Sequence, residues 1–182
     1  MTFFLILANL LVYAYTSIKS GNFLETSLDV LKTYGQFNFY VITQGWYWQL
    51  FTATFVHVNL PHLILNMFFL LIFGLRAEGF FKGTEFLFIY LASGFVGNLL
   101  TLLLPLLTVS AGASGAIFGI FGASVIYIRK AFGMPVSNAL IYSFLFLMLS
   151  ASGGVNLFAH LGGLVAGLVI GYFFAKSRKN TF

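Results

Sequence analysis

The sequence contains no cysteine and very few charged residues. Without cysteine the chain can form no disulfide framework, no thiolate nucleophile and no metal site built on cysteine. Charged residues make up 7% of the chain, against about 25% in typical soluble proteins. Hydrophobic residues make up 60%, and the mean hydropathy is +0.98. These values exclude a soluble globular protein and indicate an integral membrane protein in contact with the lipid bilayer.

Acidic residues are especially scarce, with four against nine basic residues and a net charge of +5. The basic residues are scattered over short loops and the C-terminal tail, with no basic face or motif, so we expect no nucleic-acid partner. The three histidines have no H-E-x-x-H motif around them and no cysteine to join them. We therefore expect neither a metal site nor a cofactor.

The apolar segments predict an all-α, polytopic membrane bundle in a single membrane-embedded domain, residues 1–182. One spanning helix needs about 20 residues, so several spans fit and little is left for a soluble domain. We predict six spans, at residues 2–18, 61–75, 84–104, 114–128, 136–149 and 157–175. The first of these lacks a basic leader and a small-residue cleavage site, so it is interpreted as a retained span and not as a signal peptide.

The long segment 19–60, between the first two predicted spans, has a different composition. Asn22 with Glu25 resembles a capping box, and leucines at helical spacing before Gly35 predict a short amphipathic helix. A dense set of aromatic residues follows: Phe37, Phe39, Tyr40, Trp46, Tyr47, Trp48 and Phe51. Such residues gather at the level of the lipid headgroups, so this first outer loop is expected to lie in the membrane interface.

Six spans place both termini on the same side of the membrane. If the termini are cytoplasmic, so are seven of the nine basic residues: Arg76, Lys82, Arg129, Lys130, Lys176, Arg178 and Lys179. Only Lys19 and Lys32 then lie outside. The positive-inside rule favours this orientation, and we expect a multi-pass protein of the plasma (cell) membrane with cytoplasmic termini.

Polar residues from three predicted spans fall at one depth, close to the outer side. His62 and Asn66 are four residues apart on one face of the second span, Ser114 begins the fourth span, and His160 lies near the outer end of the sixth. Polar groups inside a membrane are costly, so their convergence indicates function. A serine at a helix N-terminus has backbone N–H groups and the helix dipole beside it, which stabilise negative charge and suit a nucleophile.

The length of the fourth span indicates how deep Ser114 lies. Residues 114–128 would extend roughly 22 Å, against a hydrocarbon thickness of about 30 Å. The outer end of this span is therefore expected to begin below the membrane surface. The turn before it is tolerated at that depth only if it lines a water-filled cavity, which hydrolysis also needs.

Glycine spacing predicts which helices touch. Two stripes of small residues occur, one on the fourth span and one on the sixth: Gly115, Gly119 and Gly122, and Gly163, Gly167 and Gly171. Such stripes allow close helix approach, and packing these two together would bring His160 to Ser114. No carboxylate is expected near His160, so the pair would act as a dyad. His160 would be general base and then general acid, and the oxyanion hole would use the Ser114 N–H with side chains from the second span.

Three motifs together resemble the rhomboid family of intramembrane serine proteases. They are HLILN at residues 62–66, GASG at 112–115 and AHLGGLVAG at 159–167. The resemblance covers nearly the whole chain, including a six-transmembrane-helix rhomboid-like bundle with a long first outer loop. It implies that Ser114 is the nucleophile, His160 the base, and His62 and Asn66 the oxyanion-hole side chains. Gly112 and Gly115 would let a substrate approach Ser114 closely.

The same resemblance suggests roles for further residues. His57 matches a supporting loop histidine, and Phe118 stands where the family often has a tyrosine that stacks on the catalytic histidine. Gln49, after Trp48, replaces the arginine that is common there, so the charge that usually anchors the loop is missing and weaker anchoring is expected. Glu78 resembles a glutamate that braces the inner helix ends.

The resemblance implies an endopeptidase that cuts single-span membrane proteins near the outer membrane boundary, at helices with small or helix-breaking residues. The short fifth span and residues 150–154 after it are expected to gate lateral substrate access. One alternative is a catalytically inactive rhomboid-like protein that binds membrane helices, although inactive relatives would be expected to lose Ser114 or His160. A channel or transporter is disfavoured because no acidic residue lies at the membrane midplane and no inverted repeat of interrupted helices occurs.

Overall fold

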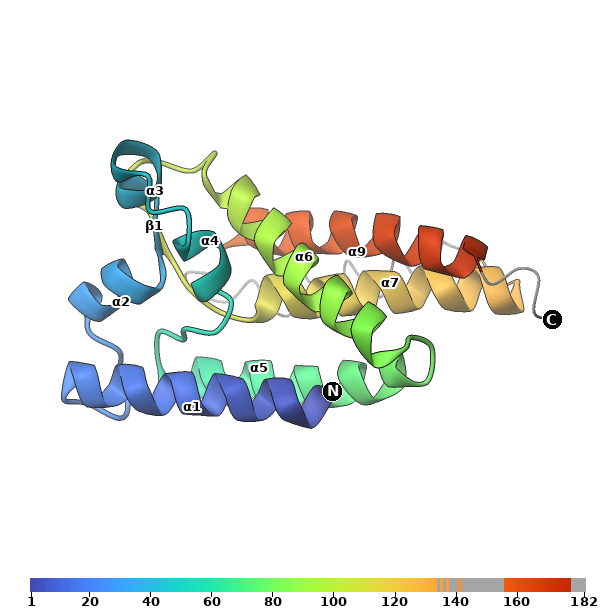
Figure 1. Cartoon of the computed structure of the whole chain (residues 1–182), viewed down its shortest axis with the longest axis horizontal. Coiled ribbons are helices and arrows are strands. Elements are labelled where there is room, and N and C mark those ends of the chain that lie inside the picture. Colours follow the sequence, from blue (N-terminus) through green and yellow to red (C-terminus); the bar gives the residue numbers. More distant parts are fainter. Residues whose placement is uncertain (134, 136, 138–140, 142–155, 178–182) are drawn as a thin grey trace.

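The computed structural model describes residues 1–133, 135, 137, 141 and 156–177, and helices dominate it (Figure 1). The helices are α1 (Thr2–Ser20), α2 (Leu28–Tyr34), α3 (Asn38–Gln44), α4 (Gln49–Thr52), α5 (Leu60–Glu78), α6 (Gly83–Thr101), α7 (Ser114–Phe132) and α9 (Leu157–Ser177). Two short strands, β1 (Gln36–Phe37) and β2 (Val109–Ser110), pair antiparallel. The predicted fifth span, apart from positions 137 and 141, and the predicted gate at 150–154 lie outside the described residues.

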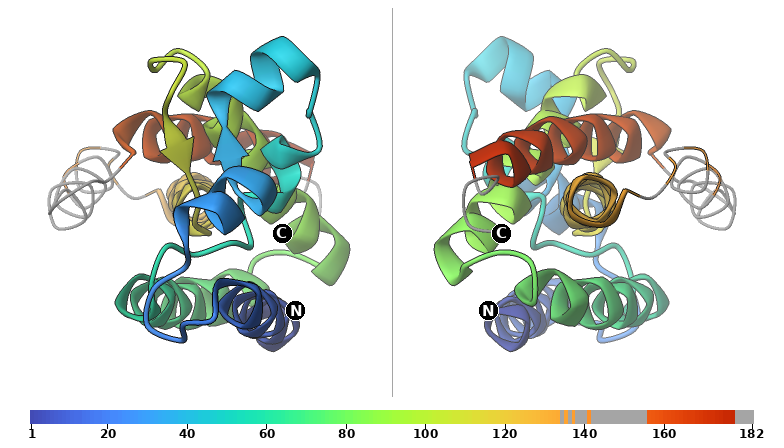
Figure 2. Two further views of the ribbon diagram at one scale, coloured as in Figure 1. Left: turned by 90° about the vertical axis from the view of Figure 1, so that its left-hand side faces the viewer. Right: turned by 90° about the vertical axis from the view of Figure 1, so that its right-hand side faces the viewer.

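Helix α7 is the centre of the bundle. Its most extensive contact is with α9, while α6 crosses both helices and α5 contacts α7 from another side. Helices α1 and α5 form a second pair, which is visible from both ends in Figure 2. The short elements α2, α3, α4 and β1 cover the end of the bundle at which α7 begins (Figure 1). The segment between α1 and α5 therefore lies over the N-terminus of the central helix, α7.

Four helices in the described part of the chain are long and apolar enough to cross a membrane, namely α1, α5, α6 and α9. Helix α7 is as long as α1, with 19 residues, but it carries the basic pair Arg129 and Lys130. Most of its residues up to Ser124 are buried. Because neighbouring helices surround α7, this helix needs less lipid-facing apolar surface than an outer helix does.

Helix α7 is longer than the predicted fourth span. Helix α7 continues through the basic pair to Phe132, so its 19 residues extend about 28 Å, close to the thickness of a bilayer core of about 30 Å. Figure 1 nevertheless shows the start of α7 set back from the outer end of α1. Ser114 therefore lies deeper in the bundle than that end because of how α7 is placed, and not because α7 is short. The ends of α1, α5, α6 and α9 differ from the ends of the corresponding predicted spans by up to three residues.

The amphipathic helix of the first outer loop begins later than Asn22. Ser27 is the N-cap of α2, and the helix ends at Gly35 as expected. The side chain of Asn22 accepts hydrogen bonds from the two backbone N–H groups two and three residues on, within a turn. Glu25 is not a capping residue, because its backbone pairs with that of Asn59, next to the start of α5. The capping-box interpretation is therefore wrong.

Gln49 anchors the first outer loop although it carries no charge. It is fully buried, and its Oε1 accepts a hydrogen bond of 2.9 Å from the Phe37 backbone N–H in β1. Its Nε2 donates to the carbonyls of Lys32 (2.7 Å) and Thr33 (3.2 Å), in the last turn of α2. Carbonyls at a helix end have no partner within the helix. One neutral amide thus ties α4 to both β1 and α2.

We expect Gln49→Ala to lower the free energy of unfolding by about 3 kcal/mol, because it leaves a buried N–H and buried helix-end carbonyls without partners. Thermal unfolding of the purified protein in detergent measures this loss. Gln44→Ala, at the exposed end of α3, makes the same chemical change and should leave the midpoint unchanged. Equal midpoints for the two variants would show that Gln49 does not anchor the loop.

Candidate active site

Ser114 and His160 are hydrogen-bonded to each other. Ser114 is the first residue of α7, and His160 lies in the first turn of α9. The His160 Nε2 and the Ser114 Oγ are 2.7 Å apart, within the range over which a general base can take a proton. The His160 ring is buried and stacks on Phe118, with ring centroids 4.5 Å apart and planes at 29°. The predicted proximity of the two side chains is confirmed.

Glycines on α7 and α9 bring the two backbones into contact. A Cβ atom at Gly163 would overlap the carbonyl oxygen of Gly115, and one at Gly167 would overlap that of Gly119. One turn further along α9, a Cβ at Gly171 would come within 2.5 Å of the Ala123 Cα. The predicted packing of the two stripes is therefore confirmed. His160 lies on this same face of α9, which is why its side chain reaches the start of α7.

Gly112 shapes the turn that leads into Ser114. Its φ of +138° lies in a region that side chains rarely allow. Its backbone N–H donates to the Ala53 carbonyl at 2.9 Å, which ties the turn to the first outer loop. A Cβ at Gly112 would stand only 2.7 Å from the Cε1 of His62. The missing side chain thus leaves room for the His62 ring beside the turn that carries Ser114.

His62 and Asn66 lie one turn apart on α5, and the His62 ring lies beside the turn that leads into Ser114. The Asn66 Nδ2 donates one proton to the His62 carbonyl at 2.8 Å, and the Asn66 side chain is buried. The Nδ1 of His62 and the Oδ1 of Asn66 are buried and have no hydrogen-bond partner among the described residues. Most buried polar atoms in proteins have such a partner. Both side chains therefore keep hydrogen-bonding capacity for a further group.

His57 packs against His62, and the Ser114–His160 hydrogen bond does not include it. The two imidazole rings meet edge to face, with centroids 5.4 Å apart, and the His57 Nδ1 is 3.2 Å from the Phe55 carbonyl oxygen. Burial, together with the neighbouring His62, lowers the pKa of His57 to about 3. At neutral pH the imidazole of His57 is therefore uncharged, and its contact with the site is a packing contact against His62.

Asn156 is a further residue at the site, and the sequence analysis did not single it out. It stands immediately before α9, and its Oδ1 accepts a hydrogen bond from the Ala159 N–H at 3.1 Å. Its Nδ2 lies 2.7 Å from the Thr101 Oγ1 and 2.9 Å from the Ser110 Oγ. An asparagine just before an apolar helix is a recognisable capping signal, but nothing in the sequence indicates its two distant partners.

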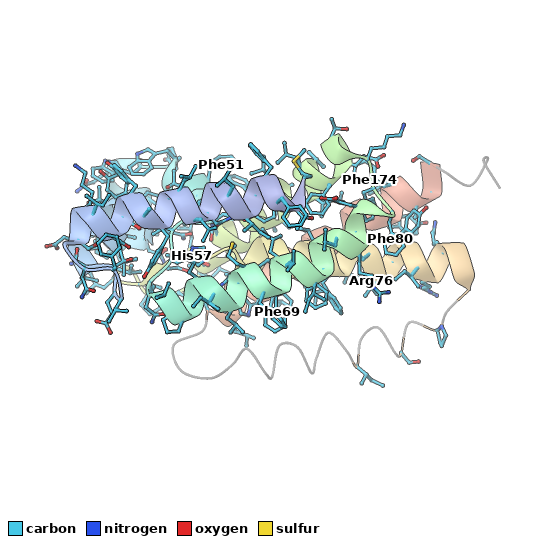
Figure 3. The ribbon with its side chains drawn as sticks, turned by 90° about the horizontal axis from the view of Figure 1, so that it is seen from below. Phe51, His57, Phe69, Arg76, Phe80 and Phe174 are labelled. Carbon is cyan, nitrogen blue, oxygen red and sulfur yellow. The ribbon has the colours of Figure 1, made fainter. Side chains whose placement is uncertain are left out.

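Glu78 lies far from this site. Its carboxylate accepts from the Thr2 backbone N–H and forms an ion pair of 2.7 Å with the Met1 ammonium. Figure 3 shows Arg76, Phe80 and Phe174 near the end of the bundle at which α5 ends, with His57 well removed from them along the bundle. Among residues 1–133 and 156–177, no group of three or more histidine or acidic side chains could hold a metal ion.

Comparison with known proteins adds an independent observation. The model of the rhomboid domain matches residues 44–177. A mitochondrial RHOMBOID-like protein 6 of Arabidopsis thaliana is 33% identical over 167 residues, which are 88% of this chain and 54% of that protein. The putative rhomboid protease YdcA of Bacillus subtilis is 31% identical over 147 residues, which are 78% of this chain and 74% of that protein. The chain thus spans about half the length of the first relative and about three quarters of the second.

Proposed function

Because this chain belongs to the rhomboid family, we propose that it is an intramembrane serine endopeptidase. The observation that carries the proposal is the hydrogen bond of 2.7 Å between the Ser114 hydroxyl and the His160 imidazole. Serine alone is a weak nucleophile and becomes reactive when a base stands within hydrogen-bond reach. A serine and histidine on two different helices, held together in the interior of an apolar bundle, are the minimum that this chemistry requires.

In the proposed reaction the Ser114 Oγ attacks the carbonyl carbon of the scissile peptide bond and its proton passes to the His160 Nε2. The negative charge on the carbonyl oxygen is stabilised by the Ser114 backbone N–H together with His62 and Asn66. His160 then protonates the leaving amine, and the C–N bond breaks to leave an ester on Ser114. A water molecule, deprotonated by His160, hydrolyses this ester and restores the serine.

We propose a dyad and not a triad because the chain has only four carboxylates and each is placed elsewhere. One lies beside the start of α5, one in α2, one at the inner end of α5 and one at the start of α6: Glu25, Asp29, Glu78 and Glu85. The stacked ring of Phe118 then helps to hold the imidazole plane that an acid would hold in a triad. The phenyl ring accepts no ordinary hydrogen bond, so Phe118 orients the imidazole through stacking alone.

The proposed substrates are single-span membrane proteins, cut near the outer membrane boundary in the cell membrane. We propose one membrane-embedded domain with six spans and cytoplasmic termini. The start of α1 and the end of α5 lie together, joined through Glu78, and α9 also ends away from the outer-loop elements (Figure 1). Arg76 and Lys82 belong to this same end, in agreement with the positive-inside rule.

The test is cleavage of a single-span protein in liposomes, with glycine and alanine placed at the outer end of its helix. We expect the wild-type protein to cleave it and Ser114→Ala to bind it without cleavage. Ser124→Ala is the matched control, because Ser124 lies on the same helix with its hydroxyl bonded to the Ile120 carbonyl, and it should cleave normally. A wild-type protein that binds the substrate as Ser114→Ala does and cleaves none would favour the inactive helix-binding alternative.

A further inference from the structure

Asn156 connects the helix that carries His160 to the turn that carries Ser114. Its Oδ1 and its backbone carbonyl accept from the N–H groups of Ala159 and His160, so it caps the first turn of α9. Its amide nitrogen reaches the last residue of α6, Thr101, and the strand residue Ser110. Ser110 is four residues before Ser114. A single side chain thus holds three separate elements at the site.

The chemistry of the neighbours defines which way this amide points. If the amide were turned over, its NH₂ group would face the Ala159 N–H, and two donors would meet. The Thr101 hydroxyl already donates its proton to the Gly97 carbonyl at 3.0 Å, so towards Asn156 it can only accept. The Asn156 NH₂ must therefore donate to Thr101. This contact excludes the second amide orientation and gives the start of α9 one defined position.

The glycine contacts between α7 and α9 do not by themselves fix the position of the start of α9. They set how close α7 and α9 approach, but a glycine has no side chain with which to hydrogen-bond the neighbouring segments. The hydrogen bond between Ser114 and His160 is lost after a shift of about 1 Å, and misplacement on that scale can slow an enzyme about a hundredfold. The link from Asn156 to Ser110 and Thr101 opposes such a shift at the first turn of α9, where it matters.

We propose that Asn156 is a positioning residue that sets the distance between the Ser114 hydroxyl and the His160 imidazole. Its consequence for catalysis rests on the proposed function, whereas its effect on the hydrogen bond does not. Asn156 acts through the start of α9, because the hydrogen bonds of its side chain go to Ala159, Thr101 and Ser110. Its contacts also join the site to the first outer loop, because Ser110 pairs with Gln36 of β1.

The experiment follows the ¹⁵N signal of His160 in detergent, in a chain that has only three histidines to assign. The ¹⁵N signal of His160 in Ser114→Ala gives the chemical shift of this imidazole without the hydrogen bond to Ser114. Asn156→Ser keeps an oxygen that can cap α9 but is too short to reach Thr101. We expect it to move the His160 signal most of the way to the Ser114→Ala position and to slow labelling of the folded protein by a fluorophosphonate probe about tenfold or more. Its unfolding temperature should fall by less than that of Gln49→Ala, because the cap of α9 is kept.

A second variant and a control keep the result interpretable. Thr101→Val has nearly the shape of threonine, leaves Asn156 in place and removes one of the two acceptors of its amide, so it should shift the His160 signal in the same direction. Asn59→Ser makes the same chemical change at the N-cap of α5 and should leave the His160 signal where it is. Because these substitutions are neutral, they add no charge that could itself move the signal.

The outcomes separate this inference from the proposed function. If neither Asn156→Ser nor Thr101→Val moves the His160 signal, Asn156 does not position the pair. If both variants move it while the wild-type protein does not react with the probe, the positioning role stands and the endopeptidase proposal fails. If both move it and also slow labelling of a reactive wild-type protein, the two proposals are supported together.

Discussion

Ser114→Ala and His160→Ala are each expected to slow fluorophosphonate labelling by about 10⁴-fold or more, and the double variant should be no slower than either single one. The physical reason is the hydrogen bond of 2.7 Å between them. The serine gains its reactivity by giving its proton to the histidine, so either side chain without the other contributes little. The time course of labelling, measured on folded protein in detergent or in liposomes, gives all three rates.

Non-additivity is the informative part of this result. Two side chains that act independently would give a double variant whose loss is the product of the two single losses. Such a product would mean that the hydrogen bond is structural and that another base serves Ser114. Normal labelling of Ser114→Ala would place the nucleophile elsewhere in the chain. Ser124→Ala should label at the wild-type rate, because its hydroxyl is used within α7.

The pairing of Ser114 with His160 could be predicted because glycine spacing marks which helix faces meet. A stripe with no side chains can be recognised in the sequence of one helix alone, and two such stripes allow their helices to approach closely. Phe118 could be placed beside His160 from the resemblance to the rhomboid family, since it follows Ser114 by one turn. The Asn156 contacts could not be predicted, because an amide can pair with almost any polar group and its partners come from three separate segments.

Gln49 shows why a substitution can be misread from the sequence. The absence of an arginine at this position predicted a weaker anchor. However, one bond that Gln49 makes is as an acceptor, from the Phe37 N–H, and a guanidinium group has no acceptor. The Gln49 amide accepts from a backbone N–H on one side and donates to backbone carbonyls on the other. The geometry of the neighbouring backbone groups, which no local pattern encodes, decides whether the charge is needed.

Helix ends were the least predictable feature of the fold. Asn22 and Ser27 are both good N-cap residues, and the pairing of Glu25 with Asn59 decides between them. Arg129 directly follows the predicted end of the fourth span, residue 128. Helix α7 nevertheless continues past it, since a helix need not stop where the hydrocarbon does and Lys130 lies over the Tyr172 ring of α9.

Gly167→Ala is expected to lower the free energy of unfolding by about 3 kcal/mol, although it adds a single methyl group. That methyl would overlap the carbonyl oxygen of Gly119 and lie 2.6 Å from its Cα. Backbone atoms cannot turn aside as a side chain can, so α7 and α9 must separate along much of their contact. Unfolding in detergent with added denaturant measures the loss. Gly83→Ala, whose Cβ would be 3.6 Å from the Met1 side chain, is the matched control and should be at least as stable as the wild type.

The position of an added methyl group along α9 should decide whether the variant loses probe labelling or only stability. Gly163 is three residues from His160, and a methyl there pushes against Gly115, next to the nucleophile, so Gly163→Ala should lose probe labelling even in molecules that remain folded. Gly171 is two turns further away, and Gly171→Ala should lose stability while its folded fraction still reacts. If both variants lost labelling and stability in equal proportion, α9 would move as one rigid body. The contacts of its first turn would then not position His160 independently of the rest of the helix.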